Sequence, residues 1–203
     1  MSFVYILTNE AMPGIVKIGR TKSRISQRMS ALDTTGVPLP FQCYFAARVA
    51  DDADVERMLH TAFGDHRLRR GREFFRLDPY RAKVVLEHIA IEDVTPRGDV
   101  GMDSEGKEAI EKVVVRTGRF NLQKYGIPVG AALEYSSDRQ ITCKVVDAEN
   151  VEFHGEAVSL SRAAVLANKS RGGTATTAAG PLWWLFEGET LASIRERFED
   201  GSS

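Results

Sequence analysis

The residues whose types suit phosphate chemistry lie near the start of the chain. Tyr5 lies in the apolar run FVYIL and Lys17 in the run IVKIG, and a Met-Pro-Gly turn separates the two. This pattern predicts a β-hairpin with both side chains on adjacent strands. Arg24 and Arg28 follow at i and i+4, on one face of a helix. Because arginine binds phosphate through paired N–H groups, these residues predict a phosphate pocket; the alternative is an ordinary solvated face.

A second group lies on a later helix. Glu56 and His60 are spaced i and i+4 and face away from the apolar stripe of Val55, Leu59 and Phe63. One carboxylate can hold Mg²⁺ when substrate phosphates and water complete its coordination. The pair can equally be a solvated hydrogen bond, so the spacing alone does not establish a metal site.

The charge is unevenly distributed. A net charge of −1 excludes a protein whose whole surface binds nucleic acid, but it allows a local basic site. Residues 1–95 carry 14 Lys and Arg against 12 Asp and Glu, whereas the remainder carries 13 against 16. The N-terminal cations form two clusters: Lys17, Arg20, Lys22, Arg24 and Arg28, and then Arg67, Arg69, Arg70, Arg72 and Arg76 around Glu73.

Composition sets further bounds. The 203 residues are 43% hydrophobic and 27% charged, which excludes wholesale disorder and fits one large or two small domains. No apolar run approaches the roughly 18–20 residues that span a membrane, and the N-terminus lacks the features of a secretory signal. Cys43 and Cys143 are too few for a disulfide scaffold or a Cys-rich zinc site. A cytoplasmic protein with reduced thiols is predicted.

The elements that position these residues predict an α+β protein of two small domains. Residues 1–95 form the first, a three-stranded sheet flanked by helices, and residues 96–119 form a polar linker. Residues 120–199 form the second, a small antiparallel sheet with short helices. Strands are expected at 3–7, 15–19, 41–49, 130–135, 141–146, 151–154 and 183–187. Helices are expected at 23–33, 79–91, 159–169 and 190–198, and a further helix is expected to begin at Asp51. Residues 170–181 are expected to form a mobile loop.

Taken in order, the N-terminal motifs resemble the GIY-YIG nuclease family. The order of motifs matches that of the family: FVYIL comes first, then VKIG followed by RT, then an arginine on the next helix and a glutamate on a later helix. VKIGRT, DADVERMLHTAF and REFFRL narrow the resemblance to the small phage and bacterial branch, over about residues 2–90. In this family two tyrosines lie beside an arginine and a glutamate that binds one divalent metal, and water attacks the phosphodiester. The resemblance implies that Tyr5, Arg28 and Glu56 take these roles.

Two positions depart from the family pattern. Phe3 replaces a structural glycine, and Lys17 replaces the second tyrosine. The resemblance implies that Tyr5, assisted by Lys17, accepts a proton from water, that Arg28 stabilises the phosphorane charge, and that Glu56 holds one Mg²⁺ or Mn²⁺ ion. An ammonium at position 17 can lower the Tyr5 pKa, or it can mark a domain that binds without cutting. Supporting roles are expected for Gly19, His60 and Glu73.

The C-terminal half resembles the RAMA domain, a module associated with restriction enzymes and adenine methylases and thought to bind DNA. The segments that carry the resemblance are GIPVGAAL, the strand after it, VEFHGEAVSLSRAA, and tryptophan followed by GETL. Trp183 and Trp184 should alternate faces on a strand, with Trp184 free to stack on a base. The alternative packs both indoles beneath the loop at 170–181.

Both halves imply the same substrate. We therefore predict a metal-dependent DNA endonuclease, restriction- or defence-related, whose C-terminal domain selects the target, with a homodimer for double-strand cleavage. The alternatives are a non-catalytic DNA-binding protein that holds phosphates and a protein adaptor without salt-dependent DNA affinity. The residues predicted to contact DNA are Arg20, Lys22, Arg24, Arg69, Arg70, Arg72 and Trp184.

Overall fold

The computed structural model describes residues 1–96, 98, 103–116, 119–176 and 178–201. The chain divides into two compact units, Met1–Ile110 and Glu111–Ser203. Each unit contains an antiparallel sheet with helices, so the predicted α+β class is confirmed. A helix, α4 (Ser104–Arg116), forms inside the segment interpreted as a linker. Parts of that segment, 97, 99–102 and 117–118, and residue 177 of the expected loop lie outside the described residues.

The sheet of the first unit has the strand order β4-β2-β1-β3-β5. Every neighbouring pair in it is antiparallel. The three strands expected from the sequence form its centre, and two short strands extend its edges. The bounds are β1 (Phe3–Thr8), β2 (Ile15–Thr21), β3 (Gln42–Arg48), β4 (Phe74–Arg76) and β5 (Glu92–Asp93).

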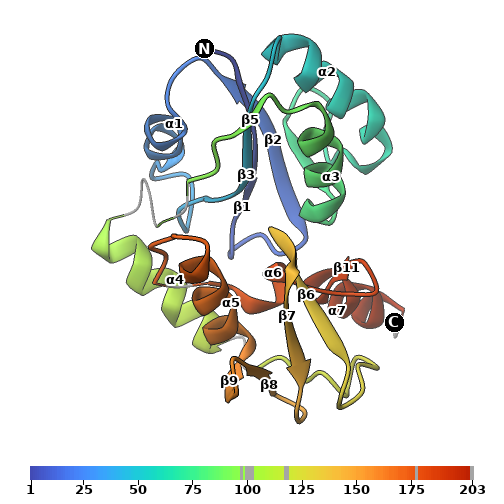
Figure 1. The fold of residues 1–203 in the computed structure, drawn as a ribbon. Coiled ribbons are helices and arrows are strands. Elements are labelled where there is room, and N and C mark those ends of the chain that lie inside the picture. Colours follow the sequence, from blue (N-terminus) through green and yellow to red (C-terminus); the bar gives the residue numbers. More distant parts are fainter. Residues whose placement is uncertain (97, 99–102, 117–118, 177, 202–203) are drawn as a thin grey trace. The chain divides into compact units, whose positions relative to one another are not determined.

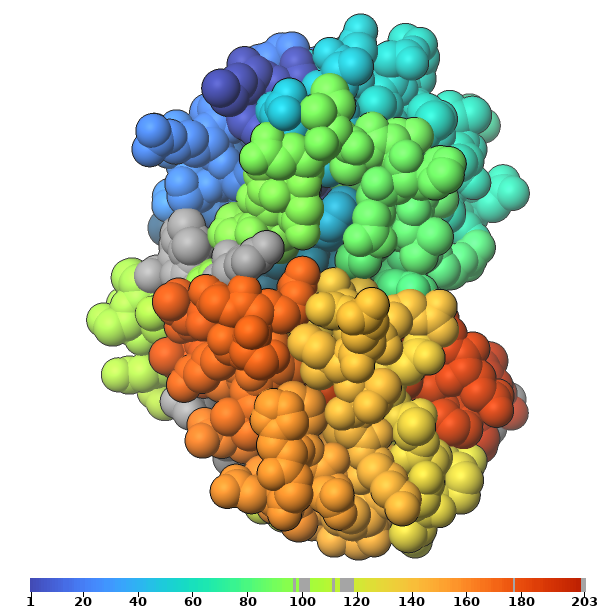
Figure 2. All heavy atoms as spheres, in the orientation of Figure 1, coloured from blue at the N-terminus to red at the C-terminus, as the bar shows by residue number. Residues whose placement is uncertain are grey.

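Helices cover this sheet on both faces. Figure 1 shows α1 (Ile25–Leu32) on one side of it, and α2 (Asp52–Ala62) and α3 (Pro79–Ile89) on the other. In the space-filling view, α3 lies on the face of the first unit that is turned to the viewer (Figure 2). Every residue of β1 is buried as a consequence, which explains its nearly continuous apolar sequence. A short 3-10 helix, η1 (Gly64–His66), leads from α2 toward β4.

The start of α2 is fixed by an aspartate, as the sequence predicted. Asp51 Oδ1 accepts the backbone N–H groups of Ala53 at 2.9 Å and Asp54 at 3.0 Å. Such a cap satisfies donors that the first helical turn leaves free. It sets the first helical residue at Asp52, so that Asp52 and Glu56 lie one turn apart on the same side of α2.

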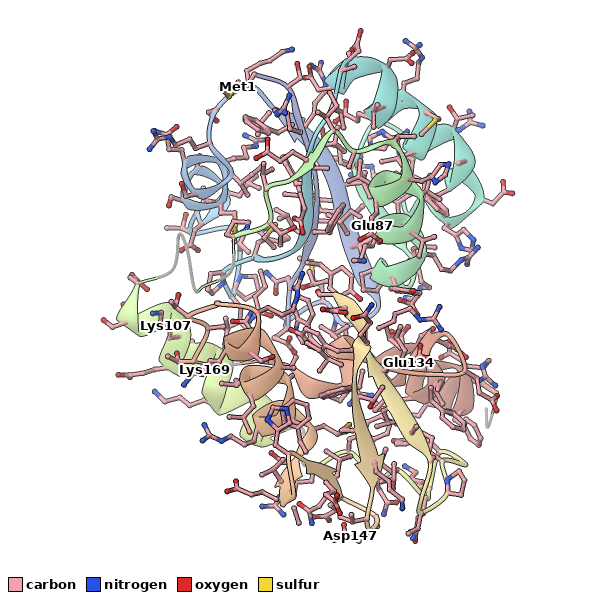
Figure 3. The ribbon with its side chains drawn as sticks, in the orientation of Figure 1. Met1, Glu87, Lys107, Glu134, Asp147 and Lys169 are labelled. Carbon is pink, nitrogen blue, oxygen red and sulfur yellow. The ribbon has the colours of Figure 1, made fainter. Side chains whose placement is uncertain are left out.

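The sheet of the second unit has the order β11-β10-β6-β7-β8-β9. Asp147 lies at the tip of the turn between β7 and β8 (Figure 3), where it accepts the N–H groups of Glu149 and Asn150, each at 2.8 Å. The bounds are β6 (Ala132–Tyr135), β7 (Asp138–Val145), β8 (Asn150–Phe153), β9 (Glu156–Ser159), β10 (Trp184–Phe186) and β11 (Glu189–Thr190), with helices α5 (Leu160–Ser170), α6 (Gly180–Trp183) and α7 (Leu191–Asp200).

Trp184 lies in the centre of the second unit. Its indole is fully buried among Tyr135, Phe153 and the alanines of α5, and its Nε1 donates to the Leu160 carbonyl at 3.0 Å. The prediction that Trp184 contacts DNA is therefore wrong. Trp183 is the last residue of α6 and Trp184 the first of β10, so the two indoles do not alternate along one strand as the sequence predicted.

Among the described residues, no helix combines the length and the apolar character needed to cross a bilayer.

Candidate functional site

Tyr5 lies across the strand next to its own. It is opposite Gly19 in the β1–β2 register, and its buried ring covers the Gly19 Cα. A Cβ at position 19 would meet the Tyr5 hydroxyl at 2.7 Å and the ring carbons at 2.8 and 2.9 Å. Glycine at this position is thus what lets the phenol cross β2.

Arg28 holds the phenol oxygen. It projects from α1, and its Nε donates to Tyr5 Oη at 3.0 Å. Burial raises the pKa of Tyr5, and the hydrogen bond and charge of Arg28 only partly offset this rise. Tyr5 is therefore a neutral phenol at pH 7. Its oxygen accepts from Arg28, and its hydroxyl hydrogen stays available to donate.

Lys17 is on the same face of the sheet as Tyr5, two residues from Gly19 along β2. Its buried ammonium pairs with Glu73 and lies 5.0 Å from the centre of the Phe74 ring. Phe74 pairs with Lys17 across β2 and β4, which brings Glu73 to the site. The cation that touches the Tyr5 phenol is accordingly Arg28, whereas the charge of Lys17 is compensated by Glu73.

Glu56 approaches from α2, on the opposite face of the sheet. Its Oε2 accepts from Arg20 Nε at 2.9 Å, and Arg20 Nη1 also donates to Asp52 Oδ2 at 3.1 Å. The other oxygen of Asp52 accepts from Lys22. Burial alone would raise the pKa of Asp52, but the hydrogen bonds from Lys22 and Arg20 hold it well below its usual range. Asp52 stays ionised between its two cations.

His60 joins α2 to the strand that carries the site. Its Nε2 lies 2.9 Å from the Ile18 carbonyl oxygen, and because a carbonyl can only accept, Nε2 carries the hydrogen. The imidazole also packs on Phe75, with 5.0 Å between ring centres. Glu56 lies one turn before His60 on the same face of α2. The contacts of His60 therefore also hold Glu56 beside β2.

The predicted catalytic residues lie along one stretch of β2 but on its two faces, with Tyr5, Lys17 and Arg28 on one face and Glu56 on the other. Tyr5 and Arg28 meet over Gly19, Lys17 precedes this stretch, and Glu56 contacts Arg20 just after it. The charges of Glu73 and Glu56 both raise the pKa of the Tyr5 phenol, so both carboxylates act on it electrostatically. The β4 strand pairs with β2 only over Ile15–Lys17, so no β4 residue pairs with the part of β2 that carries the site.

The predicted DNA-contacting cations fall into two groups. Arg20 and Lys22 are engaged by carboxylates, so their charges are compensated within the fold. The other four, Arg24 and the three arginines of residues 69–72, are exposed, and none of them has a carboxylate partner among the described residues. Three lie on one tight turn, where Arg72 N–H donates to the Arg69 carbonyl at 3.1 Å and Gly71 takes a φ of +79° that favours glycine. These exposed cations are Arg24, Arg69, Arg70 and Arg72.

One residue of the site, Asp52, was interpreted in the sequence only as part of a helix start. Its side chain is 2% exposed, yet it binds two cations, Arg20 of β2 and Lys22 just after that strand. The available signal was the i, i+4 spacing of Asp52 and Glu56, which places both carboxylates on one helix face.

The site offers a divalent cation one carboxylate. Among the described residues, no three His, Cys, Asp or Glu side chains gather as a ready-made metal site. Asp52 and the Nε2 atom of His60 are already engaged. Glu56 Oε1 has no hydrogen-bond partner in the described part of the chain. One carboxylate oxygen fits Mg²⁺, which takes one or two protein carboxylates and completes its shell with phosphate and water.

Residues 2–90, somewhat less than half of the chain, match the T5orf172 domain family. Comparison with curated proteins and with solved structures finds no significant match. The T5orf172 domain is nuclease-related, and the matched residues include every residue of the site on β1, β2, α1 and α2. At the level of the family, the first unit is similar to a domain with a nuclease-like or DNA-binding function.

Proposed function

We propose that the protein is a metal-dependent DNA endonuclease of the GIY-YIG type that hydrolyses phosphodiester bonds. The observation that carries this proposal is the meeting of Tyr5 and Arg28 over Gly19, with Lys17 and Glu56 on either side along β2. A phenol, a guanidinium and a carboxylate are the groups needed to orient water, stabilise a phosphorane and hold a divalent ion. The similarity of residues 2–90 to a nuclease-related domain supports the same class of reaction.

Tyr5 and Arg28 act on the attacking water and the phosphate. Arg28 Nε is used by the phenol, which leaves the other guanidinium N–H groups for the scissile phosphate. Tyr5 orients the water and accepts its proton once ionised. An ordinary phenol is ionised in only about one molecule in a thousand at pH 7. Burial lowers that fraction further, so we expect cleavage to be fastest at alkaline pH.

Glu56 would hold the Mg²⁺ or Mn²⁺ ion through Oε1, because Oε2 accepts from Arg20. A divalent ion in this position would supply positive charge to neutralise the leaving 3′-oxygen. Lys17, paired with Glu73, keeps a buried cation near Tyr5 and Gly19 without contacting the phenol.

DNA would be gripped by the exposed arginines. Arg69, Arg70 and Arg72 lie on the turn that leads into Glu73, the partner of Lys17. These arginines are therefore close in sequence to a residue of the site, and we expect them to bind phosphates of the same DNA. The second unit, with its RAMA-like sequence, would select the target in a restriction- or defence-related role in the cytoplasm. A homodimer would supply the second site for double-strand cleavage.

The direct test is plasmid cleavage with Mg²⁺ or Mn²⁺. We expect Arg28→Ala and Glu56→Gln to lose at least about 100-fold in rate. Glu92→Gln is the matched control, because Glu92 also pairs with an arginine, Arg48, but at the far edge of the sheet. Equal cleavage by all of these proteins would refute the assignment.

A second function is favoured by the ion pair between Arg20 and Glu56. If Arg20 keeps Glu56 permanently neutralised, the domain holds DNA without cutting it. DNA affinity then falls steeply with salt but is the same with EDTA and with Mg²⁺. A nuclease requires the metal and Glu56 for cleavage, so the two functions separate on metal dependence.

A further inference from the structure

Arg20 bridges two carboxylates that lie one turn apart on α2. Its Nε donates to Glu56 Oε2 at 2.9 Å and its Nη1 to Asp52 Oδ2 at 3.1 Å. The exposed fraction of the side chain is 2% for Asp52, 16% for Glu56 and 44% for Arg20. Asp52 is thus a buried anchor, and Arg20 reaches from it to a carboxylate at the edge of the site.

The bridge requires an arginine. Only the planar guanidinium fork presents adjacent N–H donors in a fixed geometry, and lysine would contact both carboxylates with a single rotating ammonium. The i, i+4 spacing of Asp52 and Glu56 places their side chains on one helix face, opposite a single residue of β2. The carboxylate of Glu56 is therefore held by one oxygen in one orientation, and Oε1 stays available.

The charges of this group suit a site that binds a cation. An arginine touching a metal ligand would repel the metal unless its own charge were compensated. Asp52 supplies that compensation, so Glu56 keeps its negative charge toward a cation. Lys22 pairs with the other oxygen of Asp52 from a side chain that is 66% exposed, where solvent screens its charge.

Resting on the proposed nuclease function, we propose that Arg20, anchored by Asp52, is a positioning residue that holds Glu56 with one oxygen turned toward the divalent cation. Ligand carboxylates in metal sites are themselves hydrogen-bonded, and loss of such a partner costs about 10–100-fold in metal affinity or activity. Arg20 thus belongs to the site through Glu56, although it touches neither the metal nor the phosphate.

Arg20→Lys tests this role because it keeps the charge and removes the fork. We expect the Mn²⁺ concentration that half-saturates the protein, measured by electron paramagnetic resonance of free Mn²⁺, to rise about 10-fold. The Mg²⁺ concentration for half-maximal cleavage should rise in parallel. Asp52→Asn, which releases the anchor, should act in the same direction. Arg48→Lys is the matched control, since Arg48 makes the same kind of ion pair, from Nε to Glu92 Oε2 at 2.9 Å, at the far edge of the sheet, and it should stay within about twofold of the wild type.

Three results would overturn the proposal. They are unchanged Mn²⁺ binding in Arg20→Lys, tighter binding in Arg20→Gln, which would make Arg20 a competitor of the metal, and equal losses in Arg20→Lys and Arg48→Lys. Thermal melting of each variant identifies one that fails to fold, and Arg20→Lys leaves Asp52 and Lys22 paired. Failure of the proposed function looks different. In that case the wild type does not cleave, and Glu56→Gln binds Mn²⁺ as the wild type does.

Discussion

Replacing Gly19 with alanine tests whether the phenol of Tyr5 occupies its place across β2. The new Cβ would lie 2.7–2.9 Å from the hydroxyl and two ring carbons of Tyr5. Ordinary van der Waals contact begins at 3.4 Å, so the ring has to move by about 0.5–0.7 Å. Because the ring is fully buried, it cannot turn into solvent, and its movement disturbs the 3.0 Å hydrogen bond from Arg28.

Two magnitudes follow from this displacement. Overpacking of a buried site costs about 1–3 kcal/mol in the free energy of unfolding. A displacement approaching 1 Å in a reacting group costs about 100-fold in rate. We therefore expect Gly19→Ala to remain folded at 25 °C, to unfold at lower urea concentration, and to lose most of its DNA cleavage.

The cause is isolated by a second substitution. In a Tyr5→Ala background, Gly19→Ala no longer meets a ring, so its cost in unfolding free energy should fall by at least about 1 kcal/mol. Gly64→Ala is the control, because a Cβ at position 64 meets nothing within 4 Å. The reasoning is refuted if Gly19→Ala costs the same with and without the Tyr5 ring, or if it cleaves DNA at the wild-type rate.

Three further outcomes are expected. If ionised Tyr5 is the proton acceptor, the cleavage rate should rise about tenfold per pH unit between pH 7 and 9, because the raised pKa of Tyr5 keeps the phenol protonated over that range; a flat profile would exclude this role. Gly180→Ala should destabilise the second unit by at least about 1–3 kcal/mol in urea unfolding, because its Cβ would lie 2.5 Å from the Leu160 carbonyl carbon, while Gly36→Ala should be nearly neutral. Trp184→Phe should cost about 1–3 kcal/mol, since the Leu160 carbonyl loses its donor, yet leave DNA affinity unchanged in the folded protein; weaker binding would restore a DNA contact for Trp184.

The long, regular elements of the first unit could be predicted from the sequence. The hairpin around Met-Pro-Gly, the helix after it and the aspartate that begins α2 all follow from local signals. The short strands β4 and β5 could not, because a strand of two or three residues has no periodicity of its own. Each is ordered by pairing with a strand far away in the sequence.

Four members of the candidate site could be proposed from the sequence, but Asp52 and the pairings of the side chains could not. The order of motifs indicated Tyr5, Lys17, Arg28 and Glu56. Lys17 was expected to assist the phenol, yet it pairs with Glu73 from a segment 56 residues later. Such a pairing depends on how β4 joins the sheet, which is a property of tertiary structure. The expected alternation of Trp183 and Trp184 along one strand was wrong, because Trp183 ends the helix α6 and only Trp184 belongs to β10.

The cations of the first unit perform two different tasks, which the net charge of −1 conceals. Lys17, Arg20 and Lys22 are matched by carboxylates, so their charges are compensated within the fold. The turn arginines Arg69, Arg70 and Arg72 remain uncompensated among the described residues and can contribute to binding phosphate. Under the proposed function, few free cations are directed at DNA, so the electrostatic affinity would be modest and its fall with salt would be set by the small number of phosphates contacted. Selective action on DNA would then depend on the geometry at β2 and on what the second unit recognises.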